Sequence, residues 1–187
     1  MNLKPIIAGL GAAALLLTLP ACEPEETYYT FEEISFHYSP EEFTIVSETP
    51  ISNGVHLVVK GEGTQKMDID IINRGDGFED LPWDERQAVA KADADRMFQE
   101  LVNDPSYNLT CEPINANCKL DRWSTSDVKP FSTWDVQFSE RNGEPVSSLV
   151  HVEILRNYEL RFLAEASNSD QRGNIYWLSV TFGFDDE

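Results

Sequence analysis

Five acidic residues lie close together in one segment of the 187-residue chain. Asp68 and Asp70 are two residues apart, and Asp76, Glu79 and Asp80 follow shortly after them. Carboxylate oxygens are the ligands that calcium prefers, so this segment is a candidate cation site. Its spacing does not match an EF-hand loop, and the alternative is a solvated strand face followed by a turn. Two carboxylates on one strand face project to the same side rather than across a cleft, which disfavours glycoside hydrolysis.

The three histidines, His37, His56 and His151, are far apart in the sequence. Each falls in a segment that predicts a β-strand, where a histidine is more often a half-buried sheet residue than a ligand. Their spacing matches no zinc motif, and the chain has no Gly-rich phosphate loop, His-Glu-x-x-His or Gly-x-Ser-x-Gly sequence. A Ser–His–Asp site stays open as an alternative, because it depends on geometry rather than on spacing. The sequence therefore predicts no catalytic residues and no cofactor.

Cys22 follows a long apolar segment at the N-terminus. Lys4 is the one charged residue before it, and residues 6–19 carry no charged side chain. An apolar run of this length is typical of a signal peptide and is shorter than the ~20 residues of a membrane span. Pro20 ends any helix there, and the small Ala21 directly precedes Cys22.

Leu19, Ala21 and Cys22 together resemble the cleavage site of a bacterial lipoprotein precursor, although Pro20 is not usual at its position. The resemblance implies that residues 1–21 are a signal peptide and that Cys22 becomes the acylated first residue, with palmitate among its chains. The protein would then be a lipid-anchored envelope protein that faces the periplasm. Glu23 favours the outer membrane, because sorting to the inner membrane in some Gram-negative bacteria depends on Asp at that position. An ordinary secretory leader or an uncleaved anchor is the alternative.

Cys111 and Cys118 are the other two cysteines of the chain. In an exported protein, paired thiols are oxidised, and the acylation of Cys22 leaves an even number. Pro113 and two asparagines suit a tight loop between the cysteines. The sequence therefore predicts a structural disulfide, since a redox site would favour Cys-x-x-Cys and a metal site would need further ligands.

The chain is strongly acidic, with a formal net charge of −19 that becomes −20 once Lys4 leaves with the leader. Nucleic-acid binding needs clustered Lys and Arg, so this composition argues against it. Docking on anionic lipid by charge is disfavoured for the same reason. The acidity suits a basic envelope or secreted protein as partner, or it serves only solubility.

Strands are predicted wherever apolar and polar residues alternate. The clearest case is 66–72, where Met67, Ile69 and Ile71 would be buried and Lys66, Asp68 and Asp70 solvated. The same pattern predicts strands at 28–31, 34–38, 43–47, 55–60, 132–138, 146–155, 158–166 and 175–184. Asn142-Gly143 predicts a tight hairpin turn. One face of the sheet is thus expected to be buried and the other wet.

One long helix is predicted from about 82 to 102. Pro82 suits a helix start, and Asp84 and Glu85 follow it in the first turn. A stripe at helical spacing would face the sheet: Ala90, Ala94, Met97, Phe98 and Leu101. Asn103-Asp104-Pro105 ends the helix.

The last predicted strand would carry Tyr176, Leu178, Val180, Phe182 and Phe184 on one face. Ile175 and Trp177 would then lie on the opposite face, together with Leu155 and Leu163. These four residues, Leu155, Leu163, Ile175 and Trp177, are the candidate binding residues. They form either a face that a helix covers or an exposed patch for a partner or a lipid-like ligand.

The order of strands, one helix and further strands predicts an α+β fold, with an antiparallel sheet of about 7–8 strands covered by one long helix. Residues 1–21 are the leader, 22–33 an acylated cysteine with an acidic tether, and 34–187 a single domain. This order resembles the fold shared by PsbP and Mog1, although no closing helix is evident here. The resemblance is one of topology, so it implies nothing about function.

The sequence thus favours a lipid-anchored binding or accessory protein of the cell envelope. A hydrolase with an unrecognised site and a calcium-binding module are the alternatives. A histidine beside a carboxylate in a pocket would favour the first alternative, and an oxygen cage at 68–80 the second.

Overall fold

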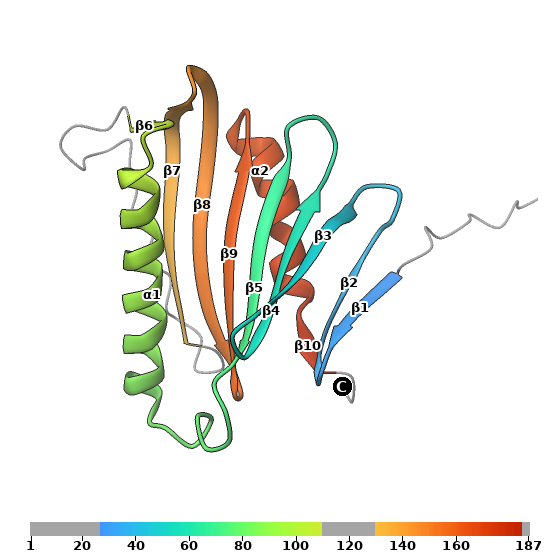
Figure 1. The fold of residues 1–187 in the computed structure, drawn as a ribbon, viewed down its shortest axis with the longest axis vertical. Helices are drawn as coiled ribbons and strands as arrows, with labels where there is room; N and C mark the ends of the chain where they lie inside the picture. The colour runs from blue at the N-terminus through green and yellow to red at the C-terminus, as the bar shows by residue number, and fades with distance from the viewer. Residues whose placement is uncertain (1–26, 110–129, 185–187) are drawn as a thin grey trace, which may run out of the picture.

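A computed structural model of the chain describes residues 27–109 and 130–184. Cys22, Cys111 and Cys118 lie outside these residues. Two antiparallel sheets and three helical segments make up the described part (Figure 1). Within it, no helix is both long and apolar enough to cross a membrane.

The main sheet has seven strands in the order β3-β4-β5-β9-β8-β7-β6. All its neighbours pair antiparallel, and the long helix follows β5 in the chain, which confirms the predicted fold class. Its elements are β3 (Thr44–Ile51), β4 (Gly54–Lys60), β5 (Lys66–Asn73), β6 (Tyr107–Leu109), β7 (Phe131–Arg141), β8 (Glu144–Leu155) and β9 (Tyr158–Ala166).

A smaller sheet packs beside the main one. It consists of β1 (Thr27–Phe31), β2 (Ile34–Tyr38) and β10 (Gly183–Phe184), in the order β1-β2-β10. Its apolar residues join those of β4, β5 and β9 in the largest core cluster, in which Phe36 stacks on Phe182 with a centroid distance of 4.4 Å. The sheet therefore closes one end of the main core.

The predicted alternation in β5 is confirmed. Met67, Ile69 and Ile71 are fully buried, whereas Asp68 and Asp70 are partly exposed on the other face. The Asn142-Gly143 turn is also confirmed, because both residues have positive φ, 53° and 83°. A type I′ hairpin turn requires this conformation at both central positions.

The predicted long helix is α1 (Trp83–Asn103), which lies over β7 and β8 on one face of the sheet (Figure 1). Four of the five residues of the expected stripe are buried, namely Ala90, Ala94, Phe98 and Leu101, and Met97 is partly buried. The alanines pack against Val150, Val152 and Ile154, and Phe98 stacks on Trp134 at 4.0 Å. Small side chains on the helix thus permit close approach to the sheet.

The prediction of a final strand over 175–184 was wrong. This segment belongs to α2 (Ser169–Tyr176) and a 3-10 helix, η1 (Trp177–Thr181), and only Gly183–Phe184 is extended. Asn168 starts α2 by accepting a hydrogen bond from the Gln171 amide at 2.9 Å. Ile175, Leu178 and Phe182 are buried at helical spacing, which the overlapping period-two pattern obscured.

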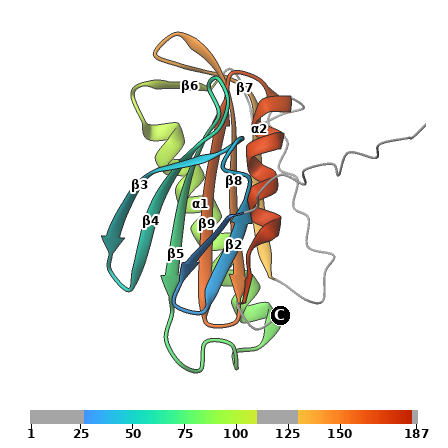
Figure 2. The same ribbon diagram turned by 90° about the vertical axis from the view of Figure 1, so that its right-hand side faces the viewer.

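Helix α2 covers the face of the sheet opposite α1 (Figure 2). The sequence showed no such closing helix, and its alternation predicted that one face of the sheet is wet. Thr133 is instead buried, and Asp135 pairs with Arg172 of α2. Both faces of β8 are consequently covered.

Candidate functional site

A cleft of about 1220 Å³ opens between the two sheets and η1. Its walls come from the end of β2 and the loop after it, from β3, from the loop between β4 and β5, and from η1. The volume exceeds what a small ligand needs, since such pockets are roughly 300–1000 Å³. The cleft is therefore large enough for part of a macromolecule.

Local hydrogen bonds hold these walls in place. In the β2–β3 loop, the Phe43 amide donates to the Ser39 carbonyl at 2.9 Å, and the Phe43 ring anchors the loop in the core. In the β4–β5 loop, the Gln65 amide side chain donates to the Gln171 carbonyl of α2 at 2.9 Å. The Thr181 hydroxyl of η1 donates to the His37 carbonyl of β2 at 3.0 Å. Because these hydrogen bonds join η1 to β2 and the β4–β5 loop to α2, the cleft is preformed.

Two large apolar side chains are exposed in this cleft. Trp177, the first residue of η1, is 65% exposed, and Val46 of β3 is 50% exposed. The pairing of β3 with β4 shifts by one residue between Ile45 and Ser47, so Val46 lies at a β-bulge. A bulge turns a side chain away from the regular alternation, which accounts for the exposure of Val46.

The charged residues in the lining are mostly acidic. Glu41, Glu42 and Glu62 line the cleft from its two loops, and all three are exposed. Lys60 lies among them with the opposite charge. The lining thus combines exposed apolar groups with a net negative rim.

The structure does not bring the four candidate binding residues together. Leu155 is half-buried at the edge of the main core, and Ile175 is fully buried in it. Leu163 lies on the other face of the sheet, where it packs against the residues under α1. Trp177 alone lines the cleft.

The candidate cation ligands are engaged in other contacts or spread along an exposed loop. The His56 ring lies 2.7 Å from Asp70 through Nδ1 and 3.7 Å from Asp68 through Nε2, and Lys66 pairs with Asp68 at 2.7 Å. Asp76, Glu79 and Asp80 are exposed. Among residues 27–109 and 130–184, no group of three His, Cys, Asp or Glu side chains is arranged to hold a metal.

His151 is the histidine with the most polar surroundings. Its Nδ1 lies 2.7 Å from Thr133 Oγ1 and 3.2 Å from the Tyr176 hydroxyl, and its Nε2 lies 3.5 Å from Glu153. This resembles a hydroxyl–histidine–carboxylate triad in composition. However, Thr133, His151 and Glu153 are at most 8% exposed, so the hydroxyl offers a substrate no access. Burial also raises the pKa of Tyr176 to about 12.

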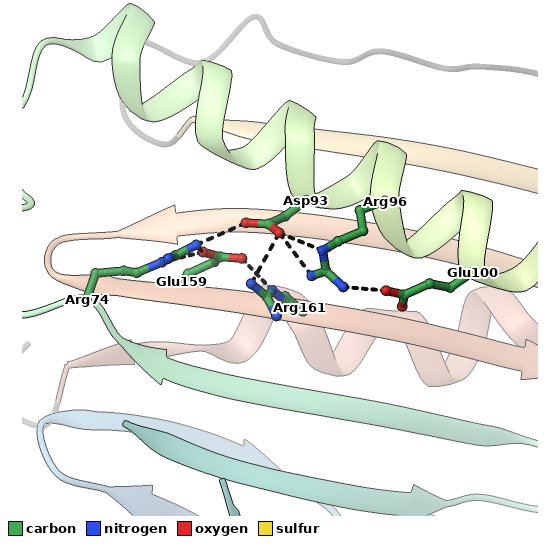
Figure 3. Close-up of polar contacts among 6 residues, drawn as sticks. All are labelled: Arg74, Asp93, Arg96, Glu100, Glu159 and Arg161. Atoms are coloured by element: carbon green, nitrogen blue, oxygen red, sulfur yellow. Dashed lines mark hydrogen bonds and ion pairs between the residues drawn. The ribbon is translucent and has the colours of Figure 1, made fainter. Parts of the chain in front are cut away.

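An ion-pair network between α1 and β9 was not predicted from the sequence (Figure 3). Glu159 of β9 is fully buried and contacts both Arg74 and Arg161. Asp93 of α1 reaches Arg74 at 3.0 Å, Arg161 at 3.2 Å and Arg96 at 2.9 Å. These contacts fix the helix on the sheet and leave no carboxylate of the network facing the cleft.

The two carboxylates of this network have opposite pKa shifts. Burial raises the pKa of Glu159, and the hydrogen bond and charge of Arg161 offset only part of the rise. Burial alone would also raise the pKa of Asp93, but hydrogen bonds with Glu159 and Arg96 and the nearby arginine charges bring it below the usual value. Asp93 is therefore the firmly ionised partner of the arginines.

Comparison with known proteins finds no family model and no curated protein that matches this chain. Among solved structures, the solution structure of cyanobacterial PsbP (CyanoP) from Synechocystis sp. PCC 6803 is similar, with a TM-score of 0.51 and 15% sequence identity. The similarity covers 94% of this chain and 98% of the other. At this identity the likeness establishes a PsbP-like fold, as the order of elements indicated, and it assigns no activity.

Proposed function

We propose that this protein is a lipid-anchored accessory protein of the bacterial cell envelope that binds a protein partner through the cleft. The observation that carries the binding role is the exposure of Trp177 and Val46, 65% and 50%, in one preformed cleft. Exposed apolar side chains with a polar rim mark interaction sites on monomeric proteins. Tryptophan is also enriched among the residues that contribute most to binding energy.

The lipid anchor rests on the sequence alone. The apolar run of residues 6–19, Leu19, Ala21 and Cys22 follow one another in the order that lipoprotein precursors share. Multiple acyl chains on Cys22 would hold the domain at a membrane, at ~0.8 kcal/mol for each buried methylene. The domain would thereby be confined near the membrane that carries its partner.

The two alternative functions receive less support. A hydrolase would need the hydroxyl near His151 to reach a substrate, yet Thr133, His151 and Glu153 are all buried. A calcium module would need convergent oxygens, yet Asp68 and Asp70 already contact Lys66 and His56. Binding of a protein partner in the cleft requires neither an accessible hydroxyl nor convergent oxygen ligands.

Site-specific photo-crosslinking in living cells tests the proposal. A benzoylphenylalanine residue at position 46 or 177 should crosslink the full chain to one discrete envelope protein. The same residue at Trp83, which is 38% exposed at the start of α1 and outside the cleft, is the matched control. Equal crosslinking at all three positions, or none at 46 and 177, would show that the cleft is not a partner site.

A further inference from the structure

The composition of the cleft also indicates the chemistry of its occupant. We propose that the cleft binds an extended cationic peptide segment of the partner, with a Lys or Arg side chain over the indole ring of Trp177. This inference rests on the proposed function, since it names the chemical class of the partner segment. It is based on the side chains that line the cleft: an exposed indole at Trp177, an apolar side chain at Val46 and several carboxylates around them.

Trp177 is the group that would recognise the cation. The face of an indole ring attracts an ammonium or guanidinium group more strongly than the other aromatic side chains do. Trp177 is 65% exposed at the start of η1, so a ligand can reach its ring. Burial of its neighbours Leu178 and Ser179 fixes the backbone that carries the indole.

The rim supplies the matching charge. Glu41 and Glu42 lie in the β2–β3 loop and Glu62 in the β4–β5 loop, so carboxylates flank the cleft from two separate segments. Among the described lining residues, Lys60 contributes a positive charge, so the rim remains negative. The whole chain adds to this field with its net charge of −19, which attracts basic partners at long range.

The shape of the cleft favours an extended segment over a compact small molecule. Its volume of about 1220 Å³ lies above the usual range for small ligands, and its lining comes from three separate chain segments. Val46 provides an apolar contact for a side chain next to the cation. Asn174, which is exposed in the last turn of α2, offers a polar contact to a peptide backbone beside Trp177.

A binding experiment with a defined probe tests this inference. The probe is an acetylated and amidated peptide in which Arg and Lys alternate with Gly and Val, and its controls have the same length with Gln or Glu at the cationic positions. The full chain, purified in a non-ionic detergent, is titrated with each peptide, and tryptophan fluorescence is recorded. We expect the cationic peptide to bind and both controls to fail.

Variants then assign the binding to the cleft. Trp177→Ala should remove the fluorescence change and weaken binding about 3- to 5-fold, as measured by isothermal titration calorimetry, which is the loss expected for an exposed cation–π contact. The matched control is Trp83→Ala, because Trp83 is exposed at the start of α1, outside the cleft.

Charge variants separate the rim from the overall acidity. Replacing Glu41, Glu42 and Glu62 by Gln should weaken binding roughly tenfold at low salt, since each exposed charge pair contributes roughly a twofold factor to the affinity and three carboxylates are removed. Replacing Asp76, Glu79 and Asp80 by amides removes the same charge from an exposed loop elsewhere and should have little effect. Lys60→Gln should strengthen binding.

The outcomes distinguish this inference from the proposed function. Equal weakening by the two triple variants would show that the peptide senses only net charge, and it would overturn the inference. Binding of the oligosaccharide chitotriose, but not of the cationic peptide, at Trp177 would overturn it in favour of a glycan site. If a partner crosslinks at position 177 while the peptide fails to bind, the partner role stands and its cationic chemistry is wrong.

Discussion

Asp93 of α1 and Arg161 of β9 lie 3.2 Å apart, between the carboxylate Oδ1 and the guanidinium Nη2. Arg161 also contacts the buried Glu159, so the pair extends into the network that joins helix and sheet (Figure 3). Asp93 is 16% exposed, so solvent screens this pair less than it screens a surface pair. Position 93 thus requires a carboxylate, although the sequence alone would assign Asp93 to the surface.

We expect Asp93→Asn to destabilise the domain by about 2 kcal/mol, between the costs for exposed and buried pairs, because Arg74 and Arg161 then share Glu159 as their one remaining carboxylate of the network. The measurement is the free energy of unfolding in urea. Glu100→Gln is the matched control, since Glu100 pairs with the same Arg96 but is 62% exposed. Its cost should stay within about 0.5 kcal/mol, as for other exposed helix pairs.

The same variant has a defined pH signature. The folded state holds the pKa of Asp93 below its usual value, so the contribution of Asp93 to stability is present above that usual value and is lost as the pH falls through the folded pKa. Asp93→Asn should remove this part of the acid dependence. Equal costs for Asp93→Asn and Glu100→Gln at neutral pH would contradict the assignment of the network as a buried one.

A second prediction concerns alkaline pH. Burial, together with the hydrogen bond to Glu32, raises the pKa of Tyr158 from 10.0 to about 12. The unfolded chain therefore loses this proton at lower pH than the folded chain does. The contribution of Tyr158 to the free energy of unfolding is complete below pH 10 and should be lost between pH 10 and about 12. Tyr158→Phe should flatten the dependence, as followed by urea unfolding across that range. Tyr28→Phe, which removes a phenol that is 67% exposed, should not.

The sheet was predictable because its alternation is unambiguous. In β5 the residues 67, 69 and 71 are apolar and their neighbours are charged, so a helix would bury Asp68 or Asp70. The helix α1 was predictable for the converse reason, since Ala90, Ala94, Phe98 and Leu101 share a face only at helical spacing. Local patterning alone therefore identifies both elements.

The C-terminal helices and the cleft could not be predicted from the spacing of apolar residues in the sequence. The residues of 175–184 fit both periods, and only the Asn168 cap together with burial of Ile175 and Leu178 decides for a helix. Trp177 was a candidate, but its neighbours in the cleft come from β2, β3 and the β4–β5 loop. The network around Glu159 was missed because a charged residue on a strand indicates solvent unless its partners are known.

A third prediction tests the anchor. Cys22→Ala should abolish acylation and release the protein from membranes, because the remaining chain has no acyl group to partition into lipid. Mass spectrometry of the mature N-terminus and membrane fractionation are the measurements. The control is Cys111→Ala with Cys118→Ala, which should stay membrane-bound. An unmodified Cys22, or cleavage at another position, would refute the lipoprotein interpretation.

A fourth prediction concerns Cys111 and Cys118, which lie outside the described residues. Thiol labelling of the unfolded, unreduced protein should modify neither cysteine if they are bonded. Replacing both by Ala should lower the melting temperature, since closing so short a loop contributes roughly 2–3 kcal/mol in the chain-entropy account. Partner crosslinking from position 177 should persist in this variant. Two labelled thiols would show that the disulfide is absent.

The last prediction concerns the rate at which the domain meets its partner. With −20 charges after loss of Lys4, long-range attraction should speed association with a basic protein. The Debye length falls from about 30 Å at 0.01 M salt to about 8 Å at 0.15 M, so the association rate should fall over that range. Stopped-flow or surface-based kinetics with the partner identified by crosslinking measure it.

The two contributions to binding should separate in the kinetics. Charge reversal at Glu41 or Glu62 changes the field at the rim and should act mainly on the association rate. Trp177→Ala removes a contact that forms only in the docked complex, so it should act mainly on the dissociation rate. An association rate that is unchanged or rises with salt would show that the acidity serves solubility alone, because a steering field must weaken as counterions screen it.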